Sequence, residues 1–83
     1  MLHCVVVTPE KAEIDEQADF IVLPMIDGEL GVQNNHTALI GRIGKGELRL
    51  TSGGQVRKYR ITGGFAQVRA NVITVLTTKV ERV

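Results

Sequence analysis

The chain has one cysteine, no tryptophan, one tyrosine and two phenylalanines in 83 residues. A lone Cys4 excludes an intrachain disulfide. Its place in the apolar run Cys4-Val5-Val6-Val7 favours a buried thiol, so a reducing compartment is the simpler expectation. Phe20, Tyr59 and Phe65 are too few and too scattered to form a base-stacking platform for single-stranded nucleic acid.

The sequence also lacks a charge excess and a long apolar run. Ten basic and nine acidic residues give a net charge of +1, which provides no general attraction to nucleic acid or acidic lipid. No apolar stretch approaches the ~20 residues that a membrane helix needs, and no secretory signal is recognisable at the N-terminus. We expect a soluble intracellular chain with no direct membrane insertion, which reaches a membrane complex only through a protein partner.

Apolar and polar residues alternate along much of the chain, which is the pattern of half-buried β-strands. The clearest case is residues 47–51, in which Leu48 and Leu50 alternate with charged and polar side chains. Residues 9–18 contain good helix formers, but Ala12 and Ile14 alternate with charged residues, so we predict a turn followed by a short strand. The remaining predicted strands cover residues 2–8, 19–23, 39–43, 55–62, 65–69 and 72–77.

Glycines separate these strands and indicate where the chain turns. Ser52-Gly53-Gly54, Gly63-Gly64 and Ala70-Asn71 fall between consecutive strands of the second half, which we interpret as a meander of hairpins. In the first half, residues 27–31 are interpreted as a loop. Short strands, glycine turns and no convincing helix predict one all-β domain over residues 1–83, an antiparallel sandwich or barrel.

Consecutive apolar residues at 5–7, 20–23 and 72–75 make both faces of those strands apolar. A two-layer sandwich has only one inner face per sheet. The surplus apolar side chains have two possible places. They either pack against strand ends and loops, or they lie on an outer face that a partner covers, because soluble monomers rarely leave large apolar patches exposed.

No constellation of catalytic or metal-binding residues emerges. His3 and Cys4 are adjacent on a strand and point to opposite faces, while His36 is distant. Ser52 is a turn residue without a nucleophile motif. The glycines at 41, 44 and 46 precede a strand, whereas phosphate loops precede a helix. We therefore expect no enzyme activity, no cofactor and no metal.

Five motifs, in order and spacing, resemble the N-terminal domain of the epsilon subunit of F-type ATP synthases. They cover nearly the whole chain. The motifs are Val7-Thr8-Pro9-Glu10-Lys11, the run from Asp19 to Pro24, Gly28-Glu29-Leu30-Gly31-Val32, Gly46-Glu47-Leu48-Arg49, and Gly63-Gly64-Phe65-Ala66-Gln67-Val68 followed by Asn71-Val72-Ile73-Thr74-Val75-Leu76. The resemblance implies a two-sheet β-sandwich of about ten short strands.

The resemblance also implies a function. The family domain is a non-catalytic part of the rotor stalk, which joins the gamma subunit to the ring of c subunits and couples proton flow to ATP synthesis. It would place the chain on the cytoplasmic face of the cell membrane, as a peripheral part of the synthase. The family's acidic ring-contact residue falls on Glu29 within the segment Asp27, Gly28, Glu29, Leu30, Gly31, and its loop histidine falls on His36.

Two departures from the family accompany this match. The family usually has Pro-Gly before the histidine and Ala-Pro after it, whereas this chain has Asn34-Asn35 and Thr37-Ala38. Family members commonly continue into two C-terminal helices, and this chain stops at Val83, either as a naturally short form or as a fragment. Helix-based inhibition and the helical ATP site are therefore not expected from these residues. The alternative function is a free-standing β-module that binds a peptide or a sugar.

Overall fold

The computed structural model describes residues 1–83 and contains ten β-strands and no helix. This confirms the all-β prediction, including the turn and short strand expected over residues 9–18. The strands are β1 (Leu2–Val7), β2 (Ala12–Ala18), β3 (Phe20–Met25), β4 (Gly28–Val32), β5 (Leu39–Arg42), β6 (Lys45–Ser52), β7 (Gln55–Thr62), β8 (Phe65–Arg69), β9 (Val72–Leu76) and β10 (Val80–Arg82).

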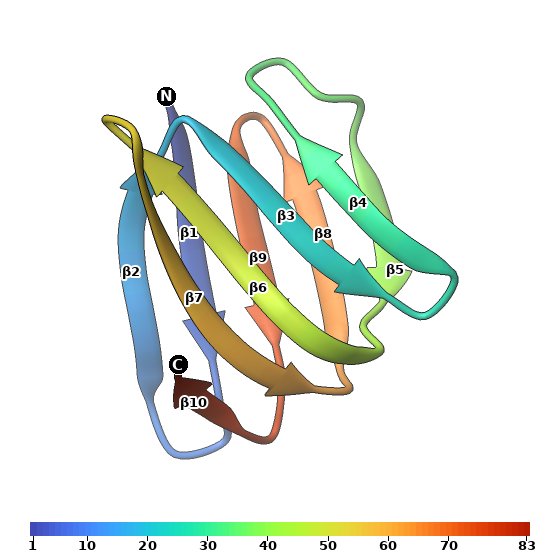
Figure 1. Ribbon diagram of the computed structural model, residues 1–83. Helices are drawn as coiled ribbons and strands as arrows, with labels where there is room; N and C mark the ends of the chain where they lie inside the picture. Colours follow the sequence, from blue (N-terminus) through green and yellow to red (C-terminus); the bar gives the residue numbers. More distant parts are fainter.

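The strands form two five-stranded sheets that pack face to face (Figure 1). Sheet A has the strand order β2-β1-β9-β8-β5, and sheet B has the order β10-β7-β6-β3-β4. Neighbouring strands are antiparallel except for β1 and β9, which run parallel with Val5 opposite Thr74. The predicted sandwich is confirmed, and the one parallel pair corrects the expectation that every pair is antiparallel.

Alternate residues of both sheets point inward and form one apolar core. In β1, Leu2, Cys4 and Val6 are fully buried, and in β6 the same is true of Leu48 and Leu50. Burial raises the pKa of the Cys4 thiol to about 12, and the negative charge of the neighbouring Glu16 adds to this effect. Cys4 is thus a packed thiol, as its apolar surroundings in the sequence predicted. The core comprises Leu2, Cys4, Val6, Ile14, Ala18, Ile21, Leu23, Val32, Ile43, Leu48, Leu50, Tyr59, Ile61, Ala66, Val68, Ile73 and Val75.

The segment Gly63-Gly64 does not close a hairpin, so the predicted meander is wrong at this point. Strands β6 and β7 form a hairpin in sheet B, β8 and β9 form one in sheet A, and the two glycines carry the chain between the sheets. Gly64 has a φ of 112°. A Cβ atom there would lie 1.9 Å from the carbonyl oxygen of Leu76, so the close approach of two backbones requires glycine.

Most of the acidic segment after β3 is a strand and not a loop, which corrects the prediction for residues 28–31, whereas Asp27 lies in a turn. Ile26 and Asp27 alone form the turn, and Met25 pairs with Gly28 across it. Gly28 takes a φ of 129°, which favours glycine at the end of this tight turn. Strand β4 is the edge strand of sheet B. The three-residue β10, which the sequence pattern did not indicate, forms the opposite edge by pairing with β7.

Candidate functional site

The structure separates the predicted site residues into two groups at the two ends of β4. Asp27 lies in the β3–β4 turn, and Gly28, Glu29, Leu30 and Gly31 follow it on β4. His36 lies in the loop between β4 and β5, beyond the other end of the strand (Figure 1). The three residue steps from Glu29 to the end of β4 alone cover about 10 Å. The structure therefore brings the first five residues together and leaves His36 apart from them.

Glu29 makes a two-pronged ion pair with Arg49 of β6. Arg49 Nη1 and Nη2 donate hydrogen bonds of 3.0 Å each to the two carboxylate oxygens of Glu29. These hydrogen bonds, and then the positive charge of Arg49, hold the pKa of the Glu29 carboxyl below its usual range. The pairing likewise raises the pKa of Arg49. The candidate contact residue is therefore an ionised carboxylate held by a partner within the chain.

The outer edge of β4 presents unpaired backbone groups. The carbonyl of Pro24 on β3 accepts a hydrogen bond of 2.8 Å from the Gly44 amide, so the backbone groups of Pro24 point away from β4. Pro24 is the register partner of Glu29. In an antiparallel pair the two opposed residues either bond to each other or both point outward. The N–H and C=O of Glu29 therefore face the open edge, where a partner can reach them.

Two asparagines shape the loop that carries His36. Asn35 has a φ of 64° and Asn71 has a φ of 65°, backbone angles that asparagine tolerates. The Asn35 amide donates a hydrogen bond of 2.7 Å to Asn71 Oδ1, which ties this loop to the β8–β9 turn. His36 Nδ1 donates to the Thr37 carbonyl at 2.7 Å. Asn34 and Asn35 form the turn directly before His36, and Asn71 holds that turn from the β8–β9 side.

The outer face of sheet A carries exposed apolar side chains, which we call the sheet A patch. Val7, Leu76 and Phe65 are register neighbours on β1, β9 and β8, and they form a row across the sheet. Four of the eight exposed large hydrophobic residues of the chain lie on this face. The patch consists of half-buried Val5 and Val7 together with exposed Ile40, Phe65, Val72 and Leu76.

The outer face of sheet B is mainly charged, with half-buried Phe20 and Val22 and exposed Val56 among its apolar members. Arg60 of β7 lies opposite Glu47 of β6 on one side and Glu81 of β10 on the other, so a row of alternating charge crosses three strands. Lys58 lies opposite Arg49 in a neighbouring row. Charges of both signs are typical of a solvated surface, and the two outer faces therefore differ in character.

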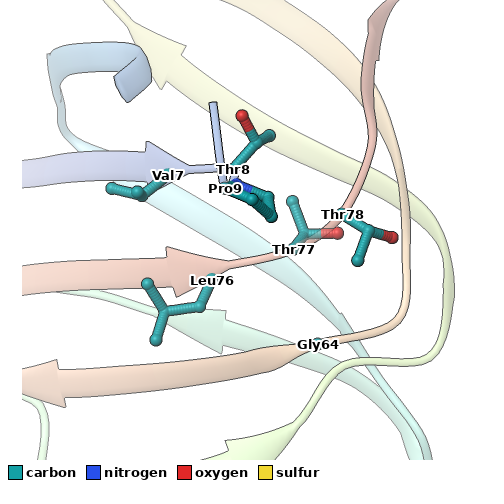
Figure 2. Close-up of a pocket in the computed structure, with 7 residues that line it drawn as sticks. All are labelled: Val7, Thr8, Pro9, Gly64, Leu76, Thr77 and Thr78. Carbon is teal, nitrogen blue, oxygen red and sulfur yellow. The ribbon is translucent and has the colours of Figure 1, made fainter. Parts of the chain in front are cut away.

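A pocket of about 370 Å³ opens at the end of the sheet A patch (Figure 2). The end of β1, the end of β9 and the chain at Gly64 form its walls. The hydroxyl of Thr77 donates to the Thr62 carbonyl, and that of Thr8 donates to the Lys11 carbonyl, so both hydroxyls are used inside the fold. The pocket contains no acidic or basic side chain and is lined by Val7, Thr8, Pro9, Gly64, Leu76, Thr77 and Thr78.

The remaining residues singled out in the sequence lie apart or form hydrogen bonds within the fold. The structure has no group of three or more histidine, cysteine, aspartate or glutamate residues close enough to hold a metal ion. The Ser52 hydroxyl donates a hydrogen bond of 3.0 Å to the Gln17 carbonyl and ties the β6–β7 turn to β2. The structure also contains no helix of the length and apolar character needed to cross a membrane.

Comparison with known proteins gives a consistent result along the whole chain. The family described as "ATP synthase, Delta/Epsilon chain, beta-sandwich domain" matches residues 1–83. An ATP synthase epsilon chain from Rhodopirellula baltica is 54% identical over 76 residues, which are 92% of this chain and 59% of that protein. The chain therefore spans less than two thirds of the length of this relative.

Two solved assemblies contain chains of the same fold. One is the Euglena gracilis mitochondrial ATP synthase, OSCP/F1/c-ring, with a TM-score of 0.89 and 24% identity over 98% of this chain and 52% of that chain. The other is the central stalk/c-ring of the Tetrahymena thermophila mitochondrial ATP synthase, with a TM-score of 0.79 and 19% identity over 98% of this chain and 66% of that chain. At these identities the likeness establishes the β-sandwich alone.

Proposed function

Because the chain belongs to the family of ATP synthase delta/epsilon-chain β-sandwich domains, we propose that it is a non-catalytic part of the rotor stalk. In this role it links the gamma subunit to the ring of c subunits and couples proton flow to ATP synthesis. It is held at the cytoplasmic face of the membrane by these partners. Family membership favours this function over a free-standing peptide- or sugar-binding module.

The observation that carries the proposal is the contrast between the two outer faces. The sheet A patch exposes apolar side chains in a contiguous row, whereas the outer face of sheet B alternates positive and negative charge. Since soluble proteins rarely leave such apolar surface in water, the sheet A patch is the face that gamma covers. A rigid sandwich fixed to gamma by one face transmits torque without slipping.

The ring contact is assigned to the β3–β4 hairpin, with Asp27, Gly28, Glu29, Leu30 and Gly31 at its tip and edge. Glu29 offers a carboxylate and free backbone groups on one open edge, and both form hydrogen bonds to polar groups of a partner. His36 lies beyond the other end of β4. It therefore belongs to the ring contact only if the ring surface extends along the whole length of this strand. Because the β3–β4 hairpin belongs to sheet B, a ring contact there leaves the sheet A patch free to bind gamma.

The gamma assignment is tested with two matched valines. Val72 lies in the sheet A patch and is 41% exposed, while Val56 lies on the outer face of sheet B and is 51% exposed. Both occupy strands, so replacement by serine changes strand propensity equally. We expect Val72→Ser to weaken the complex with purified gamma roughly tenfold, as loss of a well-packed contact does. Val56→Ser should leave it unchanged. Equal affinities of the two variants for gamma would contradict the assignment of this face.

The ring contact is tested by Glu29→Lys in the assembled synthase. This exposed substitution should leave the sandwich folded, because the side chain is 57% exposed and lies outside the core. We expect weaker attachment of the stalk to the ring and a lower ratio of ATP synthesis to proton flow. Unchanged coupling in a variant that folds normally would remove Glu29 from the contact.

A further inference from the structure

The Glu29–Arg49 pair crosses an intervening strand. Glu29 is on β4 and Arg49 is on β6, and β3 lies between them in sheet B. Neighbouring strands are about 4.8 Å apart, so the two backbones are separated by roughly 10 Å and only an extended arginine reaches the carboxylate. Val22 of β3 pairs with Arg49 on one side and Gly31 on the other. The arginine side chain therefore reaches diagonally over β3 to the edge of the sheet.

Arg49 is more firmly held than Glu29. It lies on an inner strand paired on both sides, to Val22 and to Lys58, and its side chain is 29% exposed. Glu47 Oε1 lies 3.9 Å from Arg49 Nη1 and further restrains the guanidinium. Glu29 lies on an edge strand and is 57% exposed. A planar guanidinium that binds both oxygens of a carboxylate also fixes the plane of that carboxylate.

We propose that Arg49 is a positioning residue for the ring contact: it holds the Glu29 carboxylate in one orientation at the open edge of β4. This inference rests on the proposed function, because it assumes that Glu29 contacts the ring. A carboxylate has about four acceptor positions. Arg49 occupies two of them, and the remaining two face away from the guanidinium. A partner therefore meets an oriented acceptor whose charge is largely balanced within the chain.

The experiment compares variants of the full chain in complex with gamma, titrated onto purified c ring at two salt concentrations. Arg49→Gln removes the guanidinium and leaves Glu29 mobile. We expect ring affinity to fall roughly two- to fivefold, the range typical of an exposed ion pair. We also expect the affinity to depend more steeply on salt, since the carboxylate is then unbalanced. Arg49→Lys should share the loss of affinity, because an ammonium group cannot bind both oxygens in a fixed plane. Lys58→Gln removes a neighbouring charge of the same sign and should change neither quantity.

A charge swap separates the contribution of the ion pair to the fold from its contribution to ring binding. Glu29→Arg combined with Arg49→Glu restores an ion pair across β3 and should restore the urea midpoint of the free chain. It places a guanidinium at the edge in place of a carboxylate, so ring binding should remain weak. Because the swap also removes the Glu29 carboxylate, recovery of ring binding in the swapped protein would overturn both the ring contact of Glu29 and the positioning role of Arg49.

The remaining outcomes distinguish this inference from the proposed function. If Glu29→Gln weakens ring binding while Arg49→Gln keeps both the affinity and the salt dependence of the unmodified chain, the ring contact stands and the role of Arg49 is wrong. If neither Glu29→Gln nor Glu29→Lys changes ring binding, the ring contact itself is wrong.

Discussion

The Tyr59 hydroxyl on β7 of sheet B donates a hydrogen bond of 2.9 Å to Glu16 Oε2 on β2 of sheet A. Arg57 Nε lies 2.6 Å from the other carboxylate oxygen, but its N–H bond does not point at it, so this contact is an ion pair and not a hydrogen bond. Arg57 Nη2 also donates to the Gln17 carbonyl. These polar contacts close the sandwich where β2 and β7 face each other and the apolar core ends.

Replacing Tyr59 with phenylalanine tests how much this closure stabilises the fold. The ring stays in the core, and only the hydrogen bond to Glu16 is lost. We expect the free energy of unfolding to fall by about 1–2 kcal/mol, the usual range for one hydrogen bond to a charged acceptor. The urea midpoint should fall accordingly, with an unchanged slope. Thr62→Val, on the outer side of the same strand, is the control. If Tyr59→Phe has the same urea midpoint as the unmodified chain, the packing of the two sheets does not depend on the hydrogen bond between Tyr59 and Glu16.

Alkaline pH should destabilise the protein through Cys4. The folded-state pKa of this thiol is about 12, against 9.0 in its ordinary state, because burial disfavours the thiolate and Glu16 repels it. Since the folded pKa is raised, the folded chain keeps a proton that the unfolded chain releases. The stabilisation is complete below pH 9 and is lost as the pH rises from about 9 toward 12. The expected slope is about 1.4 kcal/mol per pH unit.

Tyr59 also makes the folded chain less stable as the pH rises, but at a higher pH than Cys4. Burial, together with its hydrogen bond to Glu16, raises its pKa above 10.0. Urea unfolding measured from pH 8 to 11 should show a shallower pH dependence in Cys4→Ala than in the unmodified chain. In Tyr59→Phe, the pH dependence of the free energy of unfolding should become shallower only above pH 10. Identical slopes in Cys4→Ala and the unmodified chain would show that the thiol does not titrate differently in the two states.

Local sequence patterns were sufficient for most of the fold. Alternating burial in β6, where Leu48 and Leu50 point inward, follows directly from the alternation of residue types. Strand β4 was missed because Gly28-Glu29-Leu30-Gly31 has low strand propensity. Its pairing to β3 and the tight turn before it override that propensity. The crossover at Gly63-Gly64 was missed because a glycine pair indicates a tight bend but not which sheet follows.

The candidate site shows the same limit of local patterns. Glu29 was identified through a family resemblance, whereas Arg49 lies 20 residues away and its role depends on strand order. The alternation in β6 indicates that Arg49 points outward. It does not indicate that β3 and then β4 follow β6 in the strand order of sheet B. Of the surplus apolar segments predicted from the sequence, residues 5–7 and 72–75 contribute to the sheet A patch, whereas residues 20–23 lie on sheet B. The row of Val7, Leu76 and Phe65 follows only from the parallel pairing of β1 with β9 together with the antiparallel pairing of β8 with β9.

Asn71→Gly should loosen the loop that carries His36. Glycine keeps the φ of 65° but removes the side-chain oxygen that accepts from the Asn35 amide. We expect hydrogen exchange at the Asn35 amide to accelerate roughly fivefold, in line with about 1 kcal/mol for one hydrogen bond. Asn71→Asp keeps an acceptor and should retain the protection. Equal exchange rates at Asn35 in Asn71→Gly and the unmodified chain would mean that this bond does not hold the loop.

Gly64→Ala should destabilise the chain more than any other single methyl addition at a glycine. The new Cβ would lie 1.9 Å from the Leu76 carbonyl oxygen and 3.0 Å from Thr77 Cα, and both obstacles are backbone atoms that cannot rotate away. The φ of 112° adds strain for any residue with a side chain. We expect a loss of more than about 3 kcal/mol in the free energy of unfolding, measured by urea denaturation.

Gly53→Ala in the β6–β7 turn is the matched control. Gly53 also has a positive φ, 56°, but a Cβ there would meet no atom within 4 Å. Its substitution therefore isolates the conformational cost, about 1–2 kcal/mol. The difference between the two alanine variants measures the steric cost of carrying the chain from β7 in sheet B to β8 in sheet A, close to the end of β9. If Gly64→Ala unfolds at the same urea concentration as Gly53→Ala, the two backbones do not approach as closely at the crossover as the structure indicates.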